Sequence, residues 1–426
     1  MKGIFKSSIF LVAILAVFLT AIAFTFSNEL YSLKVNIKKY SEINEPKNTG
    51  AKRLLLSVAN YSANLIPSPR FVEIMRESED VGYGSYISQV EGFFNNTVFI
   101  SSVDELLSAL AKAKPGDDLI MKPGIYRLNQ KKVPLGSSGN ATSPIRLRAL
   151  QRGTVTIKLV SLEGIYVNKA NWIFENLIIT GECDLDDKCQ HAIHIVGDAD
   201  NLIIQNNHFK NFNAHIKSNG LVGKKGVKRE FPDNVRIRHN SFTNEWQRLT
   251  ASPVTPIDVV GGNYWEVSNN FIADFSKLRG NRTAYGAFLK GGGREGVFEK
   301  NLVACEWKVP HTSAIDIRIG LSFGGGGTAV SLCQNDNCRA EHSNGKLRSN
   351  TIVNCTNDVG IYLNKAENTK VVDNLLFNTL GIDVRFPATS AILQKNIIQG
   401  RVRARDGGLF EQRQTRNLTV FDTPIE

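Results

Sequence analysis

Lysine, arginine and aspartate side chains recur in short apolar segments in the middle of the chain, where they could carry out proton-transfer chemistry. Lys290 ends the segment AFLKG, and Arg318 lies in IDIRIG. Asp258 and Asp316 fall in the similar segments PIDVV and AIDIR. A lysine whose pKa is lowered by a neighbouring cation can act as a general base, and a guanidinium group can hold a carboxylate. This set predicts a cationic site that could meet an anionic ligand. The alternative is that the charges only solvate an exposed face.

These segments belong to a repeat that must position them. A motif of the form apolar-x-x-Asn-x-apolar recurs, mostly at steps of 22 to 33 residues. Its asparagines are Asn176, Asn207, Asn240, Asn270, Asn301, Asn350, Asn374 and Asn396, with Asn417 as a weaker ninth. Short strands, regular turns and an asparagine at the same place in each repeat predict an all-β fold, a right-handed parallel β-helix of about nine coils. The asparagine side chains are expected to stack as a hydrogen-bonded ladder.

A second strand, about 10 to 14 residues before each asparagine, alternates apolar and variable positions, which predicts two outward columns. The first column is Tyr166, His194, His215, Asp258, Phe288, Asp316, Tyr362, Asp383 and Arg403. The second is Asn168, Val196, Lys217, Val260, Lys290, Arg318, Asn364, Arg385 and Arg405. Because rungs are about 4.8 Å apart, we expect Lys290 beside Arg318.

The same columns supply the residues expected around that pair. The candidate substrate-binding residues are His215, Asp258, Asp316, Tyr362 and Arg385. His215 is also an alternative base, and the aromatic residues offer stacking surfaces to sugar rings. Asp258 and Asp316, two rungs and about 9.6 Å apart, are the candidate acid–base pair of a glycoside hydrolase.

The whole chain divides into three predicted regions. An uncharged run over residues 9–26 follows Lys2 and Lys6 and predicts a signal peptide or an N-terminal membrane anchor within residues 1–26. Residues 27–98 are expected to form a stalk or irregular segment, and residues 99–426 the β-helix. At the start of the latter, SVDELLSALAKAK predicts a capped amphipathic helix with Ser102 as N-cap and Glu105 three residues later.

Charge and cysteine content predict the compartment and the partner. The formal charge of +11 and the isoelectric point near 9.3 favour an acidic partner, either nucleic acid, anionic lipid or an acidic polysaccharide. The export signal argues against nucleic acid. We expect an exported, periplasmic or extracellular monomer. The candidate disulfides are Cys183 with Cys189 and Cys333 with Cys338. Cys305 and Cys355, on consecutive rungs, either bridge or fill the core.

The chain resembles the chondroitinase-B-like polysaccharide lyases, a parallel β-helix family that includes many alginate lyases. The segments ELLSALAKAKPGDDLIMKPGIYRL, SPIRLRAL and IYVNKANWIFENLIITG are similar to that family's N-terminal cap and first coils. The resemblance covers about residues 100 to 400. It implies β-elimination on a uronate-containing polysaccharide, with Lys290 as the base and Arg318 as the assisting acid.

The sequence also departs from the family pattern. Ile319 stands where a histidine usually follows the arginine, and Thr283 and Tyr285 stand where acidic residues help to hold calcium. These replacements argue against a calcium site like the family's, and no other cofactor is expected. A polysaccharide lyase-like enzyme is the leading prediction. A non-catalytic glycan-binding protein of the cell envelope, a glycoside hydrolase and a C5-epimerase remain open alternatives.

Overall fold

The computed structural model divides the chain into two units, Met1–Glu79 and Asp80–Glu426, which are described separately. The described residues are 72–73, 75–77, 80–85, 92–221, 229–313, 315–325, 327–334 and 337–418. The hydrophobic run over residues 9–26 lies outside them. Within the described part of the chain, no helix has both the length and the apolar character needed to cross a membrane.

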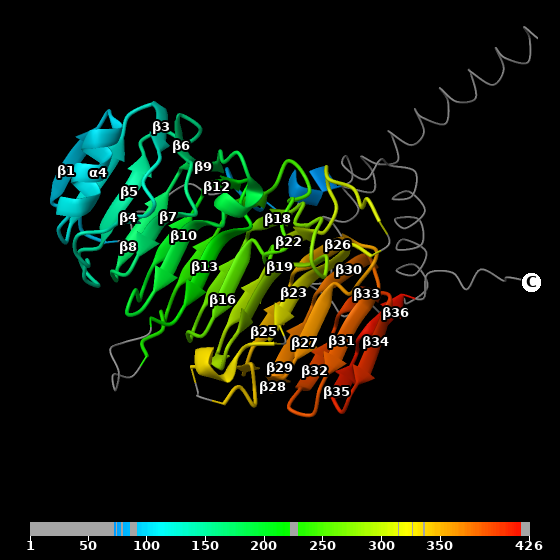
Figure 1. The fold of residues 1–426 in the computed structure, drawn as a ribbon. Helices are drawn as coiled ribbons and strands as arrows, with labels where there is room; N and C mark the ends of the chain where they lie inside the picture. The colour runs from blue at the N-terminus through cyan, green and yellow to red at the C-terminus, as the bar shows by residue number, and fades with distance from the viewer. Residues whose placement is uncertain are drawn as a thin grey trace, which may run out of the picture. The chain divides into compact units, whose positions relative to one another are not determined.

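The second unit is a stack of coils, each of which contributes one strand to each of three parallel sheets (Figure 1). Sheet A runs in the order β1 (Asn96–Ile100), β2 (Asp117–Met121), β5 (Ile145–Ala149), β8 (Trp172–Glu175), β11 (Ile203–Gln205), β14 (Arg236–Arg238), β17 (Glu266–Ser268), β21 (Val297–Glu299), β25 (Lys346–Arg348), β29 (Thr369–Val372), β32 (Ser390–Gln394) and β35 (Leu409–Arg413). Sheet B runs in the order β3 (Gly124–Leu128), β6 (Val155–Leu159), β9 (Ile178–Gly181), β12 (His208–Lys210), β15 (Ser241–Thr243), β18 (Phe271–Ala273), β22 (Leu302–Ala304), β26 (Thr351–Cys355), β30 (Leu375–Thr379), β33 (Ile397–Gln399) and β36 (Arg416–Leu418).

Sheet C positions the candidate site. It runs in the order β4 (Val133–Pro134), β7 (Glu163–Val167), β10 (His191–Val196), β13 (Ala214–Asn219), β16 (Ile257–Val260), β19 (Thr283–Lys290), β23 (Ile317–Phe323), β27 (Ile361–Asn364), β31 (Gly381–Arg385) and β34 (Arg401–Arg405). A small fourth sheet joins β20 (Gly293–Arg294), β24 (His342–Ser343) and β28 (Ala366–Glu367). Two short 3-10 helices, η1 (Asp186–Lys188) and η2 (Val330–Leu332), lie in connecting loops. The predicted right-handed parallel β-helix is confirmed.

Apolar side chains from all three sheets fill the interior of the coils. In sheet C, the inward positions of successive rungs carry buried aliphatic residues such as Ile165, Ile193, Ile216 and Ile257. No rung can bury this face by itself, so stability comes from stacking one coil on the next.

The predicted asparagine ladder is present between sheets A and B. The asparagine ladder consists of Asn207, Asn240, Asn270, Asn301, Asn350, Asn374 and Asn396. The Oδ1 atom of each later member accepts hydrogen bonds from the backbone N–H and the side-chain amide of the member before it; for Asn270 and Asn301 both distances are 3.0 Å. A buried donor on every turn is satisfied in this way.

The first and last predicted members of the ladder, Asn176 and Asn417, do not belong to it. Asn176 lies one residue early, because the ladder position of its coil is Leu177, whose N–H donates to Asn207 Oδ1. Asn176 instead has φ of 62° and occupies the left-handed position that precedes the ladder in each coil. Asn417 pairs in register with Ile398, two residues past the ladder member Asn396.

The N-terminal end of the stack is closed by the predicted helix, α4 (Val103–Lys112), which lies at the opposite end from β34 and β36 (Figure 1). Ser102 Oγ accepts a hydrogen bond from Glu105 N–H at 3.2 Å, which is the expected N-cap. Leu106 and Leu110 are fully buried, so the helix covers the open end of the core. Residues 80–85 also contact the coils: Gly82 N–H donates to Asn269 O.

The cysteine pairs expected from the sequence are disulfides. Cys183–Cys189 and Cys333–Cys338 close short loops, and Cys305–Cys355 bridges two consecutive coils. The described residues hold no free cysteine. Three disulfides agree with an oxidising compartment.

Candidate functional site

The strand register in sheet C defines one outward line of side chains. This outer column consists of Tyr166, His194, Lys217, Asp258, Phe288, Ser322, Tyr362, Asp383 and Arg403. Two of the expected members are wrong, because Lys217 replaces His215 and Ser322 replaces Asp316. The errors are two residues for His215 and six for Asp316; both shifts are even, so alternation along one strand does not distinguish the correct member from the wrong one.

Lys290 lies at the end of β19, two residues beyond Phe288. Its Nζ is 4.3 Å from the centre of the Phe288 ring. Burial lowers the pKa of Lys290, Lys217 lowers it further, and Asp258 and Glu341 act in the opposite direction. No carboxylate in the described part of the chain forms an ion pair with Lys290. This desolvated amine is the strongest candidate base on the sheet.

The predicted contact between Lys290 and Arg318 is wrong. Arg318 pairs in register with Ala284, six residues before Lys290, which at about 3.3 Å per residue is about 20 Å along the strand. The residue after the Leu289–Phe323 pair, opposite Lys290, is Gly324. Gly324 has φ of +72°, and a Cβ there would lie 1.8 Å from the carbonyl oxygen of the next coil. No side chain can occupy that position.

Arg318 instead supports a loop. It is fully buried, and its guanidinium group donates hydrogen bonds to the carbonyl oxygens of Cys305 (2.9 Å), Val309 (2.7 Å) and Pro310 (3.0 Å). Burial lowers the pKa of Arg318 to about 10, while Asp274 and Asp316 act to raise it. The catalytic role that the resemblance implies for Arg318 therefore finds no geometry here.

Asp316 and Asp258 are separated, which contradicts the expected two-rung spacing. Asp316 accepts hydrogen bonds from Arg282 Nε (2.6 Å) and Gln247 Nε2 (3.0 Å) beside the loop that leads into β23. Burial acts to raise its pKa, but the hydrogen bonds from Gln247, Arg282 and Thr312 outweigh burial and lower the pKa to about 2. An aspartate so stabilised in its ionised form is an anchor for the loop.

Asp258 and Lys217 form a pair in the outer column. Lys217 Nζ lies 2.7 Å from Asp258 Oδ1, and the two side chains are 18% and 7% exposed. Strand register brings this pair to the strand of Lys290: Asp258 pairs with Phe288, and Lys290 lies two residues further along the same strand. Lys217 was not among the expected site residues, although its segment AHIKS carried the pattern.

His215 is the clearest correction among the expected substrate contacts. It is fully buried against the rings of Phe209, Phe212 and Phe242 and is bonded through Nε2 to the Thr243 carbonyl. Burial lowers its pKa to about 3. His215 is part of the core, and it cannot touch a ligand on the outer face.

Tyr362 and Arg385 lie together further along the sheet. Arg385 Nη1 donates to Tyr362 Oη at 3.4 Å, and Asn364 Nδ2 donates to the same oxygen at 3.1 Å. Asp406 pairs with Arg385 and raises its pKa. Arg385 is about a third exposed and lies in the same line of register partners as Lys290, three rungs away, about 14 Å at the usual rung spacing. Their expected role as substrate contacts remains a prediction.

Neither the β19 positions expected from the family pattern nor the carboxylates nearer Lys290 fit a calcium site like the family's. Thr283 and Tyr285 of β19 supply no carboxylate, and burial raises the pKa of the Tyr285 hydroxyl. The nearby carboxylates have other partners: Asp258 pairs with Lys217, and Glu341 accepts hydrogen bonds from Gly291 N–H and a threonine hydroxyl. Calcium prefers several oxygen ligands, and this set does not offer them.

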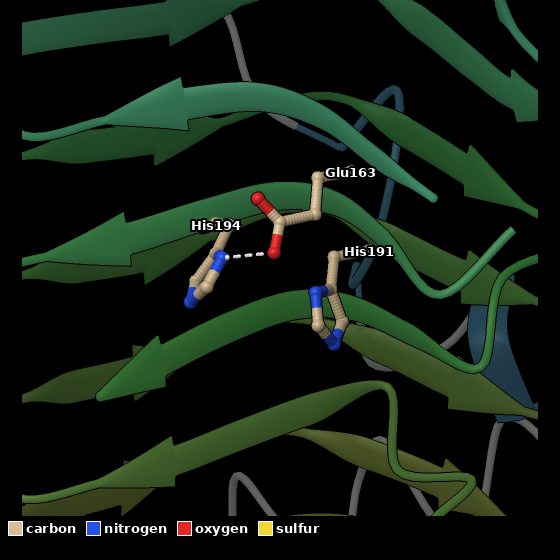
Figure 2. Close-up of side chains that lie close together, drawn as sticks. All are labelled: Glu163, His191 and His194. Carbon is tan, nitrogen blue, oxygen red and sulfur yellow. Dashed lines mark ion pairs between the residues drawn. The ribbon is translucent and has the colours of Figure 1, made fainter. Parts of the chain in front are cut away.

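A second cluster, on β7 and β10 of sheet C, was not predicted. Glu163 of β7 and His191 and His194 of β10 bring three potential ligand atoms within 4.8 Å of one another (Figure 2). The sequence signal was the His-x-x-His spacing of HAIHIV. It was missed because residues three apart on a regular strand lie on opposite faces.

A comparison with protein-family models supports the resemblance to the chondroitinase-B-like proteins. Residues 100–284 match the Chondroitinase B family model. This match confirms the resemblance predicted from the sequence. It runs from the last residue of β1 to the start of β19 and ends six residues before Lys290. The candidate base is therefore outside the Chondroitinase B match. A comparison with curated proteins found no match.

Solved structures with a similar fold include both lyases and a glycosidase. An alginate lyase from Paenibacillus sp. str. FPU-7 is 16% identical, with a TM-score of 0.46 over 74% of this chain and 99% of that one. A PL6 family polysaccharide lyase from Pseudopedobacter saltans is 14% identical (TM-score 0.40; 74% and 82%). A GH136 lacto-N-biosidase from Eubacterium ramulus is 11% identical (TM-score 0.48; 76% and 68%). At these identities the likeness concerns the fold alone.

Proposed function

We propose that this chain is a polysaccharide lyase-like enzyme that cleaves a uronate-containing acidic polysaccharide by β-elimination. The Chondroitinase B match supports the reaction class. The single observation that assigns the proposal to a residue is the position of Lys290, a partly buried amine at the end of an outward strand, whose pKa is lowered by desolvation. The positive charge of the chain favours an acidic substrate.

In this reaction the neutral amine of Lys290 takes the proton from the carbon that bears the uronate carboxylate. The electron pair forms a double bond to the next carbon as its bond to the glycosidic oxygen breaks, and the leaving oxygen takes a proton from the resulting ammonium group. The carboxylate must be neutralised while charge develops. Lys217 is the nearest cation that can do this, by exchanging Asp258 for the substrate carboxylate.

The rest of the glycan would lie along sheet C. Arg385 is three rungs from Lys290, and the Tyr362 ring belongs to the same outward face. A guanidinium group suits a second uronate carboxylate, and an aromatic ring suits the apolar face of a sugar. Asp258, once Lys217 has exchanged it for the substrate carboxylate, is left to accept hydrogen bonds from sugar hydroxyls.

A second candidate function is non-catalytic binding of an acidic glycan. The observation that favours it is the glycine opposite Lys290, where no arginine can assist the leaving group. In that case the cations of sheet C hold the polysaccharide, and Lys290 contributes affinity alone.

One experiment separates the two candidates. The full-length protein is incubated with alginate, pectate, chondroitin sulfate or dermatan sulfate, with and without calcium, and unsaturated uronate ends are followed by ultraviolet absorbance. For the lyase we expect a rise that Lys290→Ala abolishes while glycan affinity persists. Lys370→Ala, on an exposed position of sheet A, is the matched control. No rise with any polymer, together with weaker binding by Lys290→Ala, would replace the lyase by the binding protein.

We also propose that the protein acts outside the cytoplasm as a monomer, with residues 9–26 serving as a signal peptide or a membrane anchor. The three disulfides support the compartment. Cell fractionation with an alkaline carbonate wash tests the anchor, since a cleaved protein would be released and an anchored one retained.

A further inference from the structure

The Glu163/His191/His194 cluster lies on the outer side of sheet C, on β7 and β10; His194 is the register partner of Lys217, and the strand of Lys290 is three strands from β10. Glu163 begins β7 and is the register partner of His191, which begins β10. Figure 2 shows the Glu163 carboxylate directed between the two imidazole rings. All three residues are partly buried. The rings of His191 and His194 are 5.0 Å apart.

The two histidines share one side because β10 does not alternate regularly. Ala192 and Ile193, the residues between them, are both fully buried. The strand therefore bends at this point, and His191 and His194 both project away from the core. The neighbouring strand is close here, since a Cβ on Gly164 would lie 2.5 Å from the Ala192 carbonyl oxygen. The cluster is thus held by two backbones packed tightly against each other.

Hydrogen bonds outside the cluster orient His194. Its Nε2 lies 2.8 Å from Asn219 Oδ1, and the Asn219 side-chain amide donates to Gly220 O, which leaves the amide oxygen facing the ring. Nε2 must therefore donate, and Nδ1 faces Glu163 Oε1 at 3.2 Å. A histidine whose far nitrogen donates to a carbonyl-type oxygen is the usual arrangement of a metal ligand.

The state of His191 is not explained by an ion pair between Glu163 and His194. A protonated His194 could pair with Glu163 without any metal, but the Nδ1 atom of His191 is buried and has no hydrogen-bond partner. A buried polar atom without a partner costs about 1–3 kcal/mol. A cation bound by all three side chains would use this nitrogen as well as the other two ligands.

We propose that Glu163, His191 and His194 bind one divalent transition-metal ion of the zinc type. Two imidazole nitrogens and one carboxylate oxygen suit zinc and its neighbours, whereas calcium requires more oxygen ligands. Metal–ligand bonds of about 2.0–2.1 Å in a tetrahedral site put ligand atoms roughly 3.3–3.4 Å apart. His194 and Glu163 already have this separation, and a small rotation of His191 closes the site. Positions not filled by the protein remain for water or a ligand oxygen.

The test uses the full-length protein, stripped with a chelator, and Zn²⁺ as the probe. Equilibrium dialysis with elemental analysis measures stoichiometry and affinity, and Ca²⁺ is run in parallel. We expect one Zn²⁺ per chain, no competition by Ca²⁺, and at least a 100-fold loss of affinity in His191→Ala and in Glu163→Gln. Tyr166→Phe, next to His194 in the outer column, is the matched control and should bind as the parent does.

A second measurement needs no variant. Diethyl pyrocarbonate modification, mapped by mass spectrometry, should be slowed at His191 and His194 by Zn²⁺, and unchanged at His239. Absence of stoichiometric Zn²⁺, or equal protection of all three histidines, would overturn the proposal. The result does not depend on the proposed lyase activity, because neither measurement uses a polysaccharide.

Discussion

Replacing Asn301 by alanine removes one member of the asparagine ladder and tests whether the ladder stabilises the coils. Asn301 is 1% exposed, and its side chain makes four hydrogen bonds. Its Oδ1 accepts from Asn270 N–H and Nδ2, and its Nδ2 donates to Val267 O and Asn350 Oδ1. Other bonds remain for Asn270 Nδ2 and Asn350 Oδ1, but Asn270 N–H loses its partner.

The magnitude follows from these losses. One buried N–H without a partner costs about 1–3 kcal/mol, and three further hydrogen bonds contribute about 0.5–1.5 kcal/mol each. We expect the Asn301→Ala variant to lose about 3–5 kcal/mol of unfolding free energy. Asn281→Ala is the control, because Asn281 is exposed and its side chain bonds only to Thr283 N–H; its loss should stay within about 0.5 kcal/mol.

Two assays apply, because stacked coils can unfold in parts. Urea unfolding gives the global free energy, and hydrogen exchange of peptides that contain Asn270 gives the local one. A local loss of about 3–5 kcal/mol corresponds to roughly 10²- to 4 × 10³-fold faster exchange. If Asn301→Ala exchanged and unfolded as the Asn281→Ala control does, the reasoning that the ladder is a stabilising element would be refuted.

Three further predictions concern the site and its supports. The pKa of Lys290 is lower in the folded protein than in the unfolded chain, so between these two pKa values the unfolded chain binds more protons. The free energy of unfolding should therefore rise with pH in this window. Urea unfolding at about pH 8 and about pH 10 should show this rise in the parent protein and not in Lys290→Met. Arg318→Met should lower the free energy of unfolding by about 2–4 kcal/mol, because buried carbonyl groups lose their hydrogen-bond donor. Arg348→Met, at an exposed position, is the control and should lower it by less than about 0.5 kcal/mol. Equal losses would contradict the loop-supporting role of Arg318. Replacing both Cys305 and Cys355 by alanine should lower the unfolding free energy by about 4 kcal/mol, from a sequence separation of 50 residues, and a loss under about 1 kcal/mol would contradict this estimate.

The coil architecture could be predicted because its signals are local. The spacing of the asparagines, the alternation of apolar residues and the capping sequence around Ser102 each reflect chemistry within a few residues. The disulfides within the short loops were predicted for the same reason. For Cys305 and Cys355 the sequence left two alternatives, a disulfide or two free core residues, because the bridge depends on how two coils stack.

The site was predicted less well, because it depends on pairing between coils. Lys290 and Arg318 occupy similar motifs, yet β19 and β23 are long strands that bend, and the register aligns Arg318 with Ala284. His215 also satisfied the alternation, but it lies on the core side of a bend. A displacement of two positions, as for His215, or of six, as for Asp316 and Arg318, cannot be detected from spacing alone, since turn lengths vary.

The sequence by itself determined that the chain winds into parallel coils, that asparagines stack between two sheets, and that a basic outer face would carry a lysine at the end of a strand. Only the tertiary structure decided which side chains are neighbours: Lys290 with Lys217 and Asp258, and Glu163 with His191 and His194. The physical reason is that side-chain alternation is a property of one strand. Contacts across coils depend on the backbone bends and turn lengths that set the register of the whole stack.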